Sequence, residues 1–452
     1  MGNGVAYTAL IVWPLIAIYL YKTRTIQQAT LWTIVGGFMF LPVRTAIDFP
    51  MIPPLEKNTI PVISALFGCW LVNKHNLRYF SDLRGVKYLV ILLITVPFIT
   101  AALNSDAVYN GGRFLPGISY YDGISTVVNQ FLIIMPFFIG RSLFKTYAHQ
   151  LLMFRFLVAA GLLYSIPMLL EVRLSPQLHV WVYGFFPHSF LQQMRFDGFR
   201  PVVFMGHGLL VSFFTAIALI SAVTLWESKV KSKKIPASMV SYYLLVILLL
   251  CKSLASLLYG AGSFLIIKII KPNGQHKIAV ALVCLAMLYP IMSITKTVPQ
   301  DTLVNIAVSM DDERAESLIF RFDNENTLLE HGRERFFFGW GGWGRNRVFD
   351  ENGGEKTVTD GRWIITFGQF GIFGFIAEFG LLAVAVLRAK KASKLLKDRS
   401  EQLLLSSHAL IVGLIMLDQL PNASLSPWLW LITGILLGRS EEIILSNKRS
   451  RI

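Results

Sequence analysis

Long apolar runs alternate with short polar stretches along most of the chain. A helix needs about 20 apolar residues to cross the hydrocarbon core of a bilayer, and runs near that length recur about thirteen times here. The pattern therefore predicts an all-α polytopic membrane protein with about 12 or 13 transmembrane helices. We place the runs at residues 5–21, 28–43, 58–73, 88–104, 123–140, 150–170, 202–225, 236–251, 255–270, 278–293, 363–387, 402–419 and 427–438.

Two polar intervals, 171–201 and 294–362, are too long to be simple turns between these runs. In the second interval, acidic residues favour a helix start at 311 or 312, and Gly332 favours a helix end. This predicts a surface helix near 311–332. No linker or internal repeat marks off a further unit, so residues 1–452 are expected to form a single integral membrane domain with two large loops.

Composition supports a membrane protein and gives its orientation. Only 15% of the residues are charged and 54% are apolar, which leaves too little polar surface for a soluble globule. The net charge of +15 would suggest nucleic acid in a soluble protein, but here the basic residues lie between apolar runs. One alternate set of loops, with the C-terminal tail, carries 24 Lys and Arg residues, and the short loops of the other set carry four. The C-terminus is therefore expected to be cytoplasmic and the two large loops external.

The two large loops also carry twelve Lys or Arg residues that topology does not explain, because long loops are translocated regardless of charge. Solvated ion pairs with the many acidic residues of the second loop are one explanation. The other is an anion-binding cavity at the membrane surface. Arginine suits such a site because its guanidinium group binds phosphate through two parallel hydrogen bonds. The candidate residues are Arg195, Arg200, Arg314, Arg321, Arg335 and Arg345.

A Gly/Trp-rich segment lies at residues 337–344 (Phe-Phe-Gly-Trp-Gly-Gly-Trp-Gly). Glycine costs about 1 kcal/mol per residue in a helix interior, so this segment is expected to form a tight loop. Its backbone can approach a ligand closely. Trp340 and Trp343 can stack on sugar rings or anchor the loop at the membrane interface, and the sequence leaves both explanations open.

Three ionisable residues lie close to or within predicted spans. Asp360 precedes a membrane helix, where it can act as a base or simply cap the helix. His207 lies in the first turns of a span and is either functional or hydrogen-bonded to a neighbouring helix. Glu378 lies about 15 residues into its helix, roughly 22 Å deep on a straight helix, too far from Asp360 to share a site. The three cysteines lie in apolar runs without metal-ligand spacing, so we expect no disulfide framework and no metal site.

Three motifs in these loops resemble the O-antigen ligase and polymerase superfamily. The first is the pair of segments Arg314–Arg321 and Glu334–Trp343, which fit that family's last large external loop. The second is a helix start with Ile364, Phe367, Gly371 and Gly374 at the family's offsets, and the third is Arg195 with Gly206 in the earlier loop. The resemblance covers about Leu191 to Leu381. Where the family has His-Asn, this chain has Asp360-Gly361, which puts the role of Asp360 in question.

The resemblance implies a GT-C-like fold and a metal-independent, inverting glycosyltransferase without cofactor in a bacterial inner membrane, active at the periplasmic face. It implies an undecaprenyl-diphosphate-linked glycan as donor and a glycan or lipid acceptor. Membrane lipids and other polysaccharide-assembly proteins are further partners, whereas nucleic acid is not expected. Asp360 and Arg314 would be catalytic. The residues expected to bind substrate are Arg195, Arg200, His207, Arg321, Arg335, Arg345, Trp340 and Trp343.

Three functions stay open at this point. A polymerase would join lipid-linked repeat units of a surface polysaccharide such as O-antigen or exopolysaccharide. A ligase would transfer finished glycan to the lipid A core of lipopolysaccharide. The Gly/Trp loop and the Asp360-Gly361 substitution favour the polymerase slightly. A flippase for lipid-linked oligosaccharide is the rival from another class, but it would place polar groups along a path across the membrane.

Overall fold

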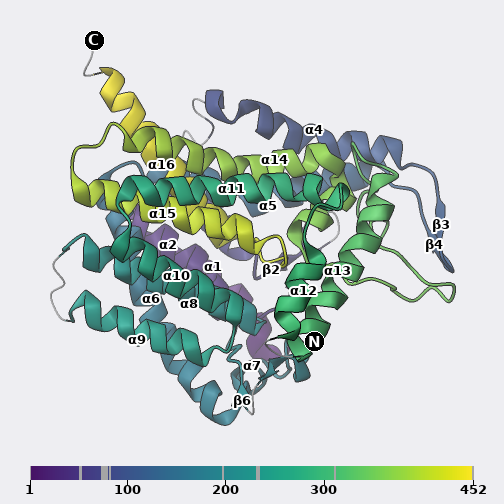
Figure 1. The fold of residues 1–452 in the computed structure, drawn as a ribbon, viewed down its shortest axis with the longest axis horizontal. Coiled ribbons are helices and arrows are strands. Elements are labelled where there is room, and N and C mark those ends of the chain that lie inside the picture. The colour runs from purple at the N-terminus through teal and green to yellow at the C-terminus, as the bar shows by residue number, and fades with distance from the viewer. Residues whose placement is uncertain are drawn as a thin grey trace.

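The computed structural model describes residues 2–49, 53–72, 80, 83–195, 198–230, 235–309 and 312–449, with the side chains of residues 84, 313 and 314 outside this description. The described chain is mostly helical, and its strands are three hairpins of two or three residues per strand. Figure 1 shows the helices packed side by side with the hairpins at their ends. The helices are α1 (Gly4–Thr23), α2 (Ile26–Phe40), α3 (Ile60–Val72), α4 (Lys87–Leu103), α5 (Tyr120–Leu143), α6 (Tyr147–Leu174), α7 (Leu178–Tyr183), α8 (Gly208–Glu227), α9 (Ala237–Leu250), α10 (Leu254–Ile269), α11 (Pro272–Ile294), α12 (Gln300–Val308), α13 (Asp312–Arg333), α14 (Arg362–Ser393), α15 (Arg399–Asp418) and α16 (Pro427–Arg449).

Many of these helices have the composition of membrane spans. Among the described residues, seven helices are long and apolar enough to cross a bilayer, namely α1, α5, α6, α8, α11, α14 and α15. Four shorter helices, α3, α4, α9 and α10, are also apolar. Each of the thirteen predicted apolar ranges overlaps one helix. The prediction of an all-α, multi-pass membrane protein is therefore confirmed at this level.

Small residues allow close packing in the centre of the bundle. Helix α16 lies against α5, where a Cβ added to Gly434 would come within 2.0 Å of the Phe137 carbonyl oxygen. A Cβ on Gly140 would likewise lie 2.6 Å from the Leu431 carbonyl oxygen. Such close backbone approach is typical of helix pairs in membranes, where packing rather than hydrophobic burial holds helices together.

The two long polar intervals lie at the same end of the bundle, which we call the loop end. The Asn3 N–H, at the start of α1, bonds the Tyr183 carbonyl in the first interval at 3.0 Å. From the second interval, Arg335 donates to the last carbonyl of α4 at Leu103. Inside these intervals lie α7 and the hairpin of β5 (Met194–Arg195) with β6 (Gly198–Phe199), and then α12 and α13. Helix α13 occupies the range predicted for a surface helix.

Helix α14 is not straight. Gly371 has φ +63° and ψ −165°, which breaks the helix into a short first segment and a long second one. The Gly/Trp segment fills the break: the N–H of Trp340 donates to the Gly368 carbonyl at 2.8 Å, and the N–H of Ile372 donates to the Phe336 carbonyl at 2.9 Å. Backbone groups freed at membrane depth must find such partners. The backbone of the Gly/Trp segment therefore approaches α14, a contact that explains its run of glycines.

Replacing Gly371 with alanine should lower the thermal midpoint of the purified protein. The left-handed conformation costs a side-chain-bearing residue about 1–3 kcal/mol, and an added Cβ would lie 2.3 Å from the Phe337 carbonyl group. The matched control is Gly262→Ala in α10, where an added Cβ meets nothing within 4 Å and helix propensity improves. Equal midpoints for the two variants would show that the break does not depend on glycine.

Candidate functional site

Arg321 and Asp360 lie side by side at the loop end. Arg321 is carried by α13, and Asp360 lies two residues before α14; the Arg321 Nε lies 3.9 Å from the Asp360 Oδ2. Arg321 also donates to the Pro421 carbonyl, in the loop between α15 and α16, at 3.5 Å. Both side chains are partly exposed, at 34% and 42%. A carboxylate and a guanidinium group are thus held together where solvent reaches them.

The first polar interval contributes Arg195 and Arg200 through the β5–β6 hairpin. Lys252, in the loop between α9 and α10, donates to the Arg195 carbonyl at 2.8 Å, and Arg200 donates to the Lys252 carbonyl at 3.0 Å. The following turn is anchored by Glu171 of α6, whose carboxylate accepts the N–H groups of Val202 and Val203, both at 2.7 Å. This anchoring fixes the segment that leads from Arg200 into α8.

His207 caps the start of α8 and belongs to the same neighbourhood. Its Nδ1 accepts the N–H of Leu209 at 3.1 Å, so this nitrogen carries no proton. Burial, followed by the nearby His188, Arg200, Arg321 and Arg195 in that order, lowers the pKa of His207 to about 3. The His188 and His207 rings lie 4.8 Å apart at right angles. His207 is therefore neutral at physiological pH and can offer only its other ring nitrogen to a ligand.

Arg200 is the buried member of this group. Its side chain is 8% exposed, and its Nε has no hydrogen-bond partner. Burial lowers the pKa of Arg200 to about 10, with further contributions from Arg195 and Arg321. Within the described part of the chain, no carboxylate lies at ion-pair distance from Arg200. Such a buried cation without an anionic partner is costly, unless an anion binds beside it.

We call Arg195, Arg200, His207, Arg321 and Asp360 the arginine cluster. The mutual electrostatic effects of its members place residues from both polar intervals in one region of the loop end. The side chain of Arg314, predicted to be catalytic, lies outside the described residues. Guanidinium groups can bind a diphosphate, and a carboxylate beside one of them, as Asp360 lies beside Arg321, can accept a proton from a hydroxyl group. No group of three or more His, Cys, Asp or Glu residues within the described ranges lies close enough to hold a metal ion.

The other predicted substrate-binding residues lie elsewhere. His331 follows Arg321 by ten residues on α13, about 15 Å along the helix. Its ring stacks on Trp340 with centroids 4.5 Å apart, and the Arg335 guanidinium lies 4.2 Å from the Trp340 ring centre. Trp340 is 8% exposed, so it is sandwiched within the protein rather than offered to a sugar.

Arg345 is bound to the connection between α4 and α5. Its side chain is 1% exposed and donates to the carbonyls of Asp106 and Pro116, both at 2.9 Å. These contacts favour a structural role for Arg345. Trp343, in contrast, is 71% exposed, with φ +59°, and is free to meet a ligand or the membrane interface.

Glu378 lies much closer to the start of α14 than the predicted separation of roughly 22 Å. It accepts three hydrogen bonds, at 3.0, 3.2 and 2.6 Å, from Arg362, which is sixteen residues earlier on the same helix. On a straight helix this separation would be about 24 Å. The contact is possible because α14 folds back at Gly371. The resulting ion pair lies two residues from Asp360.

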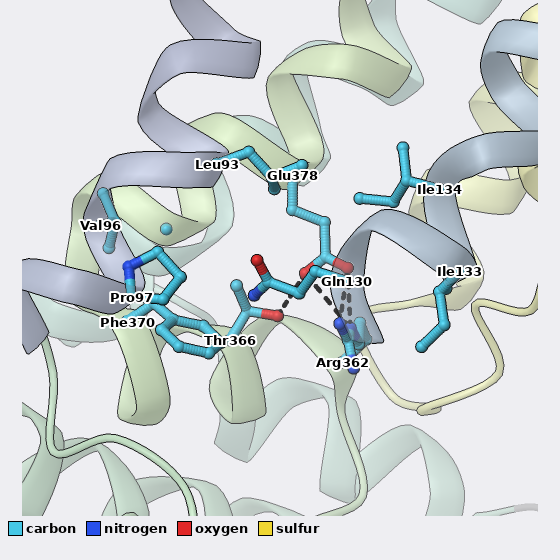
Figure 2. A pocket seen from close by; sticks show the side chains of 11 residues that line it. Leu93, Val96, Pro97, Gln130, Ile133, Ile134, Arg362, Thr366, Phe370 and Glu378 are labelled. Carbon is cyan, nitrogen blue, oxygen red and sulfur yellow. Dashed lines mark hydrogen bonds and ion pairs between the residues drawn. The ribbon is translucent and has the colours of Figure 1, made fainter. Parts of the chain in front are cut away.

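The ion pair lines a cavity between α4, α5 and α14, shown in Figure 2. Its wall on the α4 side is apolar, and the α5 side contributes Ile133, Ile134 and the polar Gln130. In Figure 2 the side chains of Gln130, Thr366 and Glu378 gather beside Arg362 at the polar side of the cavity. The Thr366 hydroxyl donates to Glu378 at 2.5 Å, and the side-chain Oε1 of Gln130 is buried without a hydrogen-bond partner.

Sequence reasoning missed Lys252, His188 and the Arg362–Glu378 pair. Lys252 lies in a short connection and signals topology rather than chemistry. Glu378 did carry a signal, because a carboxylate at membrane depth requires a cationic partner. The partner was hidden by the fold-back of α14.

Comparison with known proteins adds no assignment. No protein-family model matches the sequence, and a search of curated proteins finds no significant relative. The motifs described above are therefore the basis of the resemblance to the O-antigen ligase and polymerase superfamily.

Proposed function

We propose that the chain is a multi-pass glycosyltransferase of a bacterial inner membrane that acts on polyprenyl-diphosphate-linked glycan and polymerises repeat units of a surface polysaccharide. In this proposal α1–α6, α8–α11 and α14–α16 cross the membrane, the loop end is periplasmic and the C-terminus is cytoplasmic. The single observation that carries the proposal is the arginine cluster, where Arg321 of the second loop lies 3.9 Å from Asp360 and is close enough to Arg200 of the first loop to lower its pKa.

The proposed reaction forms one bond and breaks one. The acceptor hydroxyl oxygen bonds to the anomeric carbon of the donor sugar, while the bond from that carbon to the diphosphate breaks. Asp360 accepts the hydroxyl proton, and the attack from the opposite face inverts the anomeric configuration. Arg195, Arg200 and Arg321 stabilise the negative charge that develops on the leaving diphosphate. This reaction needs several cationic groups and one carboxylate, and the arginine cluster has this composition.

A transfer assay tests this function directly. The purified chain in lipid nanodiscs receives a defined polyprenyl-diphosphate oligosaccharide in the presence of EDTA, and mass spectrometry follows both free polyprenyl diphosphate and glycan length. Longer lipid-linked glycan with equimolar release of polyprenyl diphosphate is expected. Arg347→Ala is the matched control, because Arg347 lies in the same loop and pairs with Glu355 outside the cluster. Absence of released diphosphate with every acceptor offered, including a lipid A core, would contradict the proposal and favour transport.

A further inference from the structure

Asp360 is two residues before Arg362, which forms an ion pair with Glu378. This proximity suggests how the arginine cluster is held together. We infer that Glu378 is a positioning residue: it holds Arg362 at the start of α14 and thereby keeps Asp360 beside Arg321. The inference rests on the proposed function for its chemistry. Its geometric content, that an ion pair at membrane depth controls the Asp360–Arg321 distance, can be measured without any reaction.

The start of α14 is fixed from two directions. Its backbone is held by the loop between α15 and α16, because the Arg362 N–H donates to the carbonyls of Gln419 and Asn422, both at 3.0 Å. At Gly361 the fit is so close that an added Cβ would lie 2.2 Å from the Leu420 carbonyl oxygen. The Arg362 side chain is held from the other direction by Glu378.

Arg321 uses the same loop as a support. It donates to the Pro421 carbonyl, between the residues that hold Arg362. The α15–α16 loop therefore holds both Arg321 and the chain segment that carries Asp360. Rotation of the first turn of α14 would move Asp360 relative to Arg321 even if that loop stayed in place.

The ion pair is suited to prevent such a rotation. Arg362 donates from Nε to both Glu378 oxygens, at 3.0 and 3.2 Å, and from Nη2 to Oε1 at 2.6 Å, so the contact with both oxygens fixes orientation as well as distance. Thr366, one turn further along the same segment, donates to the second Glu378 oxygen at 2.5 Å. Glu378 thus holds two successive turns of the first segment against the second segment.

Packing alone does not hold the segment on this side. Arg362, Thr366 and Glu378 line a cavity between α4, α5 and α14, so the first segment of α14 is incompletely packed against α4 and α5 there (Figure 2). An ion pair with one buried member adds little stability, since a well-packed apolar pair is often as stable. At this gap in the packing the ion pair fixes one orientation of the segment, which an apolar pair would not.

The first test measures the distance between positions 360 and 321. In a background without the three native cysteines, Arg321→Cys and Asp360→Cys are combined and treated with a short thiol-to-thiol cross-linker. The cross-link yield should fall several-fold when Glu378→Gln is added, and equally when the apolar pair Arg362→Met with Glu378→Leu is added. Glu355→Gln, which removes the exposed Arg347–Glu355 pair, is the control and should leave the yield unchanged.

The second test separates positioning from stability in the transfer assay. Glu378→Gln should reduce kcat about tenfold with little change in KM, since a misplacement of 1 Å is enough for losses of this size. Arg362→Met with Glu378→Leu should regain the thermal midpoint but not kcat. An unchanged cross-link yield, or wild-type kcat in that double variant, would overturn the inference. If the wild-type protein transfers no glycan, the proposed function fails, while the cross-link yield still decides the role of Glu378.

Discussion

Replacing Asp360 with asparagine should lower the kcat of glycan transfer by about 10²–10⁴-fold, the usual contribution of a general base. The amide keeps the size of the carboxylate and can still accept a hydrogen bond, so donor binding should change little. It cannot take up the proton of the acceptor hydroxyl. The measurement is the initial rate of polyprenyl diphosphate release by purified protein in nanodiscs, at saturating donor and acceptor.

The control for this substitution is Asp323→Asn. Asp323 is an exposed carboxylate on α13, two residues after Arg321, so its replacement changes the net charge near the site by the same amount. Its rate should stay within about twofold of wild type, as expected for a surface substitution away from special contacts. A wild-type rate for Asp360→Asn would assign the proton transfer to another residue of the cluster. Equal losses in both variants would point to net charge rather than to a base.

The helices were predictable because a membrane imposes one strong rule. Each backbone N–H and C=O in the hydrocarbon region needs an internal partner, so a long apolar run is almost always a helix. The predicted run 363–387 shows where the rule stops. The whole run reads as one apolar helix, yet Gly371 breaks the helix, and the partners for the freed backbone groups come from residues 336–341. No local pattern in 363–387 reports that a distant loop will supply those partners.

The candidate site was predictable in part for a similar reason. Arginines in a long external loop have no role in topology, so Arg195, Arg200 and Arg321 were recognisable as candidates. Whether a loop side chain is buried could not be predicted, because its burial depends on contacts with residues far away in the sequence. Arg345 is buried against Asp106 and Pro116, more than 200 residues earlier in the chain. The same holds for Trp340, which the sequence presents as an aromatic residue in a tight glycine-rich loop.

Replacing Arg200 with methionine should weaken the binding of a polyprenyl diphosphate by about 10- to 100-fold without lowering the thermal midpoint. A hydrogen bond to a charged group contributes about 1.5–3 kcal/mol, which accounts for the loss of affinity. The thermal midpoint should be retained or raised. The guanidinium group of Arg200 is buried with one carbonyl partner, and among the described residues no carboxylate lies at ion-pair distance from it. Titration of a fluorescent polyprenyl diphosphate and a thermal melt of the same sample measure the two quantities.

Arg345→Met is the control for Arg200→Met, and its thermal midpoint should change in the opposite direction. Arg345 is also buried, and its Nε and Nη2 make no hydrogen bond, but its Nη1 donates to two backbone carbonyls and its Nη2 lies 4.0 Å from the Asp106 carboxylate. Removing it leaves those acceptors unpaired, at about 1–3 kcal/mol each when buried, so the thermal midpoint should fall. A residue kept for structure and a residue kept for a ligand thus differ in the sign of the effect on stability. If Arg200→Met is destabilised as much as Arg345→Met and binds the diphosphate normally, Arg200 is structural, and the arginine cluster loses its buried anion-binding member.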